Sequence, residues 1–292
     1  MSIDRVLNVG WSGIWIGCEF GAIGVALVLA FRACRVIDLS LGQVFVFAAM
    51  LAAWLQAKGA SPAAAAIAGT AVGTGLAVGQ EHLLLRRLEN ATPSILLMAT
   101  LAVAITLSGL SAVFFGRDPV SGAGLVGPGY VQVRGWRASW DSIVFVALVL
   151  LLTAAIGWFV SFSAFGKTMS AAGDDPGAAR MLGIDVWSLR LAGMALAGTV
   201  AAAAGVLFLP LGVLDFTLGL RLTLFGFVAA AIVGYESVPG ALLGGWLFGL
   251  VDAFGRAWVS SVFGEAVAFG ALIAVILTAR RLRVIRTIFQ TA

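Results

Sequence analysis

The sequence holds few residue combinations that could bind a nucleotide or carry out catalysis. Residues 161–168 (SFSAFGKT) come within one position of the phosphate-binding pattern GxxxxGKT, but Ser161 replaces the first glycine. No strand pattern precedes the segment, although a phosphate-binding loop needs a strand before it and a helix after it. His82 is the only histidine, and no cysteine or carboxylate cluster accompanies it, so a metal site or a histidine-dependent catalytic set cannot be assembled. We therefore expect no catalytic residue, no metal site and no cofactor bound by this chain.

Polar residues inside apolar segments are the next candidates, because a polar side chain is costly in a bilayer and is often retained for function. The run 37–43 (IDLSLGQ) is rich in them and is continued by an apolar segment. For Asp38 a structural role is the alternative, as a helix cap or as the ion-pair partner of Arg32 or Arg35. The residues that we predict to line a solute pathway are Asp38, Ser40, Gly42 and Gln43.

Other notable residues in apolar segments have a simpler structural interpretation. Glu19 and Asp252 both fall in apolar segments, and Asp252 can pair with Arg256 one helical turn away. Cys18 and Cys34 lack CxxC spacing and a histidine partner, so we interpret them as small buried residues. Two glycine faces are predicted to allow close helix packing: Gly69, Gly73, Gly75 and Gly79, and Gly240, Gly244, Gly245 and Gly249.

The stretch 166–190 (GKTMSAAGDDPGAARMLGIDVWSLR) is the most polar long segment of the chain and carries helix signals. Asp175 can accept the free N–H groups of a first helical turn, and Pro176 suits the first helical position. Gly183 can adopt the left-handed conformation that ends a helix. We therefore predict about two turns of helix between two membrane spans, held by a protein outside the membrane. The residues that we assign to this contact are Asp174, Asp175, Pro176, Arg180, Met181, Leu182 and Gly183.

Composition places the elements around these candidates in a membrane. The chain has 292 residues, of which 61% are hydrophobic and 11% charged, whereas a soluble domain carries about 25% charged residues. A span needs about 20 apolar residues, and the sequence therefore predicts an all-α, polytopic transmembrane helical bundle of eight to ten spans. Two segments, 37–57 and 219–235, could instead form broken or re-entrant helices. The predicted spans are 11–31, 37–57, 62–82, 94–115, 141–162, 190–210, 219–235, 238–257 and 262–279.

Lysine and arginine residues are divided unevenly between the two sides of these spans. Because positive residues are enriched in cytoplasmic loops, we predict that the C-terminus and a loop at 163–190 lie in the cytoplasm, and that the loop 116–140 lies outside. One transmembrane domain is expected over 1–292, with its first segment retained rather than cleaved. The net charge of +4 arises at segment ends, so a nucleic-acid partner is not expected. The group assigned to the cytoplasmic side is Arg32, Arg35, Arg86, Arg87, Lys167, Arg180, Arg190, Arg280, Arg281, Arg283 and Arg286. The smaller group, assigned to the outer side, is Arg5, Lys58, Arg117, Arg134, Arg137, Arg221 and Arg256.

Three segments together resemble the permease subunits of the ABC importers for branched-chain amino acids, the high-affinity leucine/isoleucine/valine family. They are VIDLSLGQVFVFAAM (36–50), AFGKTMSAAGDDPGAARMLGID (164–185) and VPGALLGGWLFGL (238–250), within a likeness that covers nearly the whole chain. The resemblance implies a type-II-like, multi-pass permease of the bacterial inner membrane. The run 37–43 departs from the family's usual NFAHG and is closer to the sugar permeases of the same superfamily, which leaves the substrate open.

The resemblance also implies partners. In this family the loop at 163–190 is a coupling helix that docks on a cytoplasmic ATPase subunit, and ATP with Mg²⁺ is bound there rather than by this chain. A second permease subunit, different or identical, and an external solute-binding protein complete the implied machinery. The implied cargo is a branched-chain or other hydrophobic amino acid, with a sugar, urea or an amide as alternatives. An ion-coupled secondary transporter is a further alternative, although the chain has few intramembrane carboxylates and no detectable repeat.

Overall fold

The structure is a computed structural model that describes residues 3–258 except 90, 128, 134, 234 and 236, together with residue 270. The predicted span 262–279 and the basic C-terminal residues lie outside the described residues. Helices dominate the described part of the chain. The elements are α1 (Ile3–Cys34), α2 (Leu41–Ala57), α3 (Pro62–Leu83), the 3-10 turn η1 (Leu85–Leu88), α4 (Pro93–Phe115), β1 (Tyr130–Val133), β2 (Trp136–Ser139), α5 (Trp140–Phe162), α6 (Ala164–Asp174), α7 (Pro176–Met181), α8 (Val186–Phe208), α9 (Leu218–Val233) and α10 (Val238–Trp258).

Within the described residues, six helices are long and apolar enough to cross a membrane, and α2 and α9 are shorter apolar helices. The six are α1, α3, α4, α5, α8 and α10. Each predicted span up to residue 257 coincides with one of these eight helices, which confirms the polytopic helical bundle. The sequence did not predict the antiparallel hairpin β1–β2 in the loop 116–140, where Tyr130 pairs with Ser139 and Val133 with Trp136.

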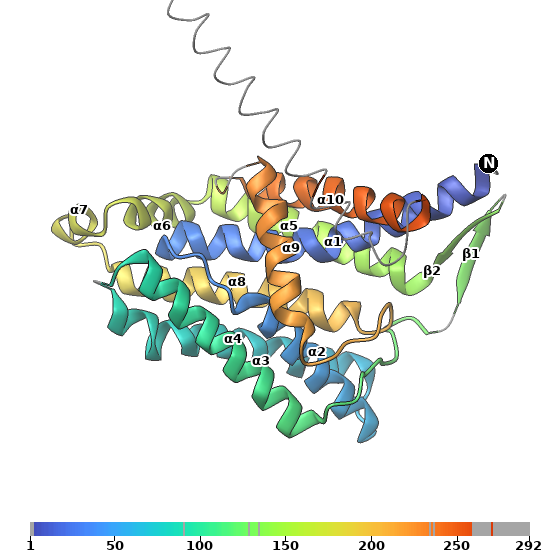
Figure 1. The fold of residues 1–292 in the computed structure, drawn as a ribbon. Helices are drawn as coiled ribbons and strands as arrows, with labels where there is room; N and C mark the ends of the chain where they lie inside the picture. Colours follow the sequence, from blue (N-terminus) through green and yellow to red (C-terminus); the bar gives the residue numbers. More distant parts are fainter. Residues whose placement is uncertain are drawn as a thin grey trace, which may run out of the picture.

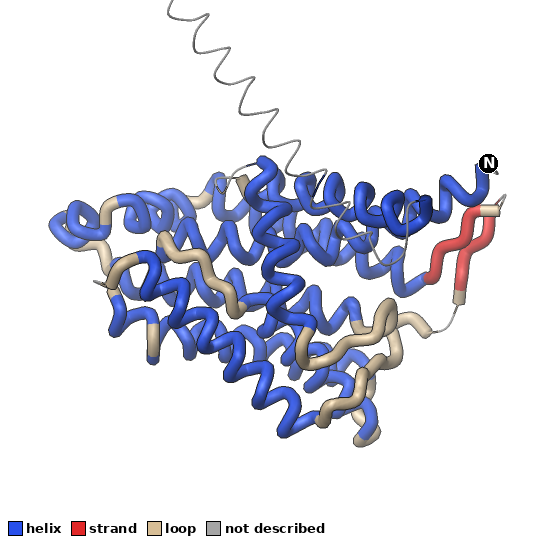
Figure 2. Tube along the Cα trace, viewed as in Figure 1, coloured by secondary structure: helices blue, strands red, loops and turns tan. Residues whose placement is uncertain are grey.

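Helix α1 runs through the bundle in contact with α5, α8, α9 and α10 (Figures 1 and 2). Its residues 17–30 are buried throughout. Glycines allow α10 to approach it closely: a Cβ atom at Gly17 would lie 2.7 Å from the Cα atom of Trp246, and one at Gly13 would lie 2.9 Å from that of Leu250. Small residues at a crossing are the usual way in which membrane helices pack backbone to backbone. The close packing predicted for the glycines of α10 is confirmed for Gly245 and Gly249 at this crossing and for Gly244 against α9.

The glycine face predicted for α3 is only half correct. A Cβ atom at Gly69 would lie 2.7 Å from the carbonyl oxygen of Ala48, and Gly73 likewise packs against α2 and α8. Gly75 and Gly79 instead face open space. The reason is helical geometry, since a step of two residues turns the side-chain direction by about 200° in a helix of about 3.6 residues per turn.

The two groups of basic residues from the sequence gather at opposite ends of the bundle. At one end the N-terminal part of α1 meets the hairpin: the side chain of Asn8 donates to the carbonyl of Gly135 at 3.0 Å, and Trp11 packs edge-on against Trp136. At the other end lie η1, α6 and α7, and Figure 1 shows α7 and the hairpin at opposite extremes of the molecule. The division into two sides is confirmed for the described residues, whereas the assignment of the α7 end to the cytoplasm stays a prediction.

Helices α2 and α9 both begin inside the bundle. With 17 residues, α2 is about 26 Å long, which is less than the roughly 30 Å of a bilayer core. The two helices meet near these ends, because the N–H of Gly42 in the first turn of α2 donates to the hydroxyl of Thr223 in the second turn of α9 at 3.0 Å. The predicted span 37–57 is thus corrected: its helix starts only at Leu41, after a non-helical segment, as expected for a broken helix.

Candidate functional site

Helix α7 has the local structure that its sequence predicts. The carboxylate of Asp175 accepts a hydrogen bond from the N–H of Ala178 at 2.9 Å, and Pro176 takes the first helical position. Gly183 closes the helix with a φ of +76°. One face of α7 packs on α6 and α8. The other projects Met181 and Leu182, which are 84% and 80% exposed, from the end of the bundle.

Helix α6, which precedes α7, was not predicted, because the loop was expected to run from residue 163 without a second helix. The hydroxyl of Ser163 caps it by accepting from the N–H of Gly166 at 3.0 Å. Gly166, Met169 and Gly173 form its buried face, a spacing of three to four residues that is the signal the sequence offered. Because α6 packs against α1 and α8, it connects the transmembrane bundle to α7.

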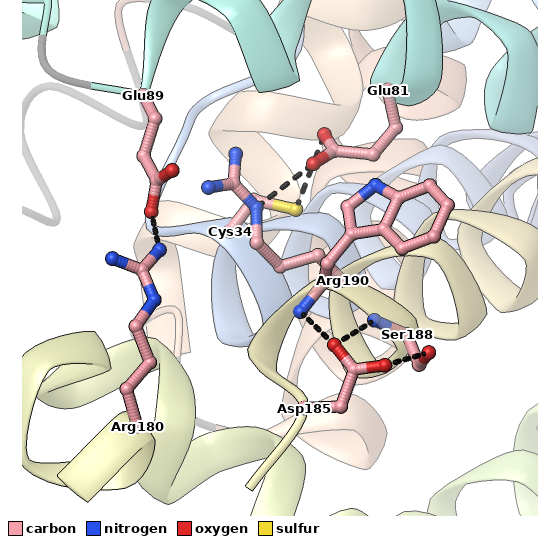
Figure 3. A network of polar contacts seen from close by, with 8 residues as sticks. Cys34, Glu81, Glu89, Arg180, Asp185, Ser188 and Arg190 are labelled. Carbon is pink, nitrogen blue, oxygen red and sulfur yellow. Dashed lines mark hydrogen bonds and ion pairs between the residues drawn. The ribbon is translucent and has the colours of Figure 1, made fainter.

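The charged residues predicted to meet a partner protein have partners within this chain. Asp174 ends α6 rather than belonging to α7, and it forms an ion pair with Arg35, the residue that terminates α1 in a left-handed conformation at φ +54°. Arg180 forms an ion pair with Glu89, which follows η1 (Figure 3). Asp174 and Arg180 therefore hold α6 and α7 to the bundle, and Asp175 is a cap, whereas the contact of these residues with a partner protein stays a prediction.

A buried ion pair beneath this surface was missed by the sequence analysis. The Nε atom of Arg190 in α8 lies 2.8 Å from Oε1 of Glu81 in α3, and the two side chains are 11% and 0% exposed. The N–H is not aligned with the oxygen, so the contact is an ion pair rather than a hydrogen bond. Cys34 donates its thiol to the other carboxylate oxygen at 3.7 Å (Figure 3). An ion pair therefore joins α3 and α8 near α7, and a thiol hydrogen bond adds the end of α1.

The residues predicted to line a pathway come together at the start of α2. The carboxylate of Asp38 accepts from the backbone N–H of Ser40 at 2.9 Å and from the side-chain amide of Gln80 at 3.0 Å. The amide of Gln43 donates to the carbonyl of Phe216 at 3.0 Å. Asp38, Ser40 and Gln43 are at most 1% exposed. In this conformation the cluster holds α2 in place, and its role in a solute pathway stays a prediction.

Two polar residues of this cluster, Gln80 and Thr223, were not among the predicted site residues. Thr223 is fully buried in α9, and its hydroxyl donates to the carbonyl of Leu39 at 3.1 Å. Of the structural alternatives for Asp38, the ion pair with Arg35 is not formed, since Arg35 pairs with Asp174. Asp38 instead accepts from the N–H of Ser40, the residue that precedes α2. Broken helices that meet within the bundle are the usual setting of solute sites in transporters.

Comparison with known proteins identifies the family of this chain. Residues 16–277 match the family described as the permease component of the branched-chain amino acid transport system. The chain belongs to this permease family. It is similar to the high-affinity branched-chain amino acid permease LivH of Escherichia coli, with 23% identity over 281 residues that cover 91% of each chain. It is also similar to BraD of Pseudomonas aeruginosa, with 25% identity over 282 residues and the same coverage.

A solved structure has the same fold as this permease. It is an inward-facing metal-chelate-type ABC transporter, with a TM-score of 0.51 and 16% identity, which covers 92% of this chain and 87% of the other. At this identity the likeness concerns the fold, and it agrees with the type-II-like architecture expected from the sequence. The chain is thus a membrane protein and the permease component of an ABC importer.

Asp185 supplies a pH-dependent contact where α7 leads into α8. Its carboxylate accepts from the N–H groups of Trp187 and Ser188 at 3.1 and 3.3 Å and from the hydroxyl of Ser188 (Figure 3). These hydrogen bonds, first that of the Ser188 hydroxyl, lower the pKa of Asp185 below its ordinary value of 3.8. A carboxyl group with a lowered folded-state pKa stabilises the fold above its unfolded pKa and loses that effect as the pH falls through the folded value.

We predict that Asp185→Ala lowers the thermal unfolding midpoint of the detergent-solubilised protein at neutral pH. The difference from the unmutated protein should shrink as the pH falls below 3.8, because the wild-type carboxylate then takes up its proton. Unfolding curves of both proteins at neutral and acidic pH measure it. A difference that stays constant over this range would show that the charge of Asp185 contributes nothing.

Proposed function

We propose that this permease carries branched-chain or other hydrophobic amino acids inward across the bacterial inner membrane, driven by a separate cytoplasmic ATPase that docks on α7. The observation that carries the proposal is the exposed pair Met181 and Leu182 on a helix whose two ends are both capped. Apolar side chains of this size gain from being covered by a partner. ATP and Mg²⁺ then belong to the ATPase, and this chain binds no cofactor.

The rest of the machinery follows from this role. A second permease subunit, different or identical, completes the membrane part, and an external solute-binding protein delivers the cargo to the end that carries the hairpin. Family membership and the relatives named for branched-chain amino acids support this cargo. A sugar, urea or an amide moved by the same machinery is the alternative, and an ion-coupled secondary transporter would need no ATPase at all.

We predict that Met181→Asp or Leu182→Asp abolishes co-purification of the ATPase while the permease still inserts in the membrane. A carboxylate placed in an apolar contact loses its hydration, which costs several kcal/mol, roughly a hundredfold in affinity or more. Co-purification from membranes that contain the ATPase and the other subunits measures the loss. Val126→Asp is the matched control: Val126 is 57% exposed in the loop at the opposite end, and its variant should keep the ATPase. Retention of the ATPase by both α7 variants would contradict the coupling role.

A further inference from the structure

A cavity lies at the α7 end of the bundle, between the end of α3, the segment that follows it, α7 and the start of α8. The space there is about 160 Å³. A cavity of about 150 Å³ accommodates a benzene-sized molecule, so this one has room for a phosphate group. The transport role proposed above makes no use of it. Its charged lining residues and one tryptophan are Glu81, Arg86, Glu89, Arg180, Trp187 and Arg190.

The lining of this cavity carries more positive than negative charge. Arg180 and Arg190 each form an ion pair with a glutamate that also lines the space (Figure 3). Arg86 forms no ion pair within the described part of the chain, and its guanidinium lies 4.2 Å from the centroid of the Trp187 ring. Asp185 lies outside the lining, and its carboxylate is occupied by hydrogen bonds from the first turn of α8. With both pairs neutral, the lining has one positive charge in excess, which favours an anion.

The indole N–H of Trp187 indicates a ligand that accepts hydrogen bonds. This group is buried and has no acceptor among the described residues, so neither lining glutamate accepts from it. Buried donors are almost always paired in native proteins, and an unpaired one calls for an explanation. The lining arginines cannot serve, because a guanidinium group has no acceptor atom. An anion with several oxygen atoms would supply the missing acceptor and the missing negative charge together.

The cavity lies where a membrane span ends. Helix α3 ends at Leu83, which is 62% exposed, and only 22% of the most apolar stretch of this span is buried. Gly75 and Gly79 of α3 face open space. Because a helix turns once in about 3.6 residues, both glycines share a stripe with His82, whose ring lies 5.5 Å from that of Trp187. An open strip of α3 therefore leads from the middle of the span to the wall of the cavity.

We propose that this cavity binds the headgroup of an anionic phospholipid whose phosphodiester carries one negative charge, with an acyl chain along the open strip of α3. Arg86 and the indole N–H of Trp187 donate to the phosphate oxygens, and the single negative charge matches the excess charge of the lining. Basic pockets between spans at a membrane surface bind lipid headgroups in other membrane proteins. The inference goes beyond the transport function and does not depend on the cargo. Because the lining comes from α3, α7 and α8, the bound lipid also holds α7 in place.

The test is titration of the detergent-purified permease with phosphatidylglycerol, with bound lipid counted by native mass spectrometry. Arg86→Gln should weaken binding by about tenfold or more, because it removes a charged hydrogen-bond partner of the phosphate. Arg87→Gln is the matched control: Arg87 is the next residue of η1, is exposed and does not line the cavity, so its variant should bind within about twofold of wild type.

Two further variants test the tryptophan donor by itself. Trp187→Phe keeps an aromatic ring beneath Arg86 but removes the N–H, and it should weaken binding by about threefold or more. Trp158→Phe makes the same change at a 68% exposed tryptophan of α5 and should leave binding unchanged. Thermal unfolding of each variant without added lipid separates a loss of the site from a loss of folding. Trp187→Phe also keeps the proposal testable if Arg86→Gln does not fold.

Two other ligands separate the lipid from a free anion. Phosphatidylcholine with the same acyl chains has no net charge and should bind about tenfold more weakly or less tightly still, and millimolar inorganic phosphate should not displace phosphatidylglycerol. Displacement by inorganic phosphate would identify a site for the free anion and overturn the lipid assignment. Equal binding of phosphatidylglycerol by wild type and by folded Arg86→Gln and Trp187→Phe would also overturn it. If the permease binds no phosphatidylglycerol but Arg86→Gln releases the ATPase, the cavity belongs to the ATPase contact, and the lipid proposal fails while the coupling role stands.

Discussion

Arg190→Met should lower the free energy of unfolding of the detergent-solubilised permease by about 3–5 kcal/mol. Its partner Glu81 is fully buried at the end of α3, so removal of the guanidinium leaves a buried carboxylate without its cationic partner. The thiol of Cys34 is only a weak donor and cannot replace a full charge. Denaturant unfolding followed by tryptophan fluorescence measures the change.

Two further variants separate the buried charge from packing. The double variant Glu81→Met with Arg190→Met should regain most of the stability, because replacing both members of a buried pair by apolar residues is often neutral or stabilising by about 1–4 kcal/mol. Arg180→Met is the exposed comparison, since Arg180 and Glu89 are 55% and 34% exposed, and it should change stability by less than about 1 kcal/mol. Equal effects of Arg190→Met and Arg180→Met would contradict the assigned role of the buried pair.

The pair has a mechanical consequence for the coupling to an ATPase that we propose. Arg190 lies one turn inside α8, directly after the segment that carries α7, whereas Glu81 ends α3. Arg35 and Glu89 hold Asp174 and Arg180 from α1 and η1 on the same side. A force applied to Met181 and Leu182 would therefore be passed to α1, α3 and α8 through charged contacts rather than through a flexible loop.

Sequence signals that act over a few residues predicted local structure well. The cap at Asp175, the proline after it and the closing Gly183 all lie within one short segment, and each adopts the predicted geometry. Membrane spans are equally local, since each depends on one run of apolar residues, and the eight predicted up to residue 257 coincide with helices.

Such local signals do not indicate which residues that are distant in sequence contact each other. Asp38 was weighed against Arg32 and Arg35, its neighbours in the chain, but its acceptor capacity is used by Ser40 and by Gln80 from another helix. The ion pair of Glu81 and Arg190 joins segments that no pattern in the sequence relates. The sequence also does not indicate that Arg221 and Arg256, which belong to different helices, line one cavity.

Gly245→Leu should prevent the recovery of folded permease from membranes, and Gly245→Ala should already lower the free energy of unfolding by about 1–3 kcal/mol. A Cβ atom at Gly245 would overlap the backbone of Gly21 and Gly17 in α1, and backbone atoms in the middle of a buried helix cannot move aside as a flexible side chain can. Yield of monodisperse protein after solubilisation and denaturant unfolding measure the two variants. Gly75→Ala and Gly75→Leu are the matched controls, because Gly75 in α3 faces open space.

The same crossing sets the distance between two buried carboxyl groups, those of Glu19 and Asp252, which line one cavity between α1, α9 and α10. Glu19 lies between Gly17 and Gly21 on α1, and Asp252 lies less than one turn beyond Gly249 on α10. Widening the crossing by a methyl group at Gly245 therefore moves one carboxylate relative to the other. We expect the fraction of Gly245→Ala that does fold and assemble to carry less leucine than wild type, whereas Gly75→Ala should carry it normally. Full uptake by the assembled Gly245→Ala variant would mean that transport does not depend on the spacing of α1 and α10 at this crossing.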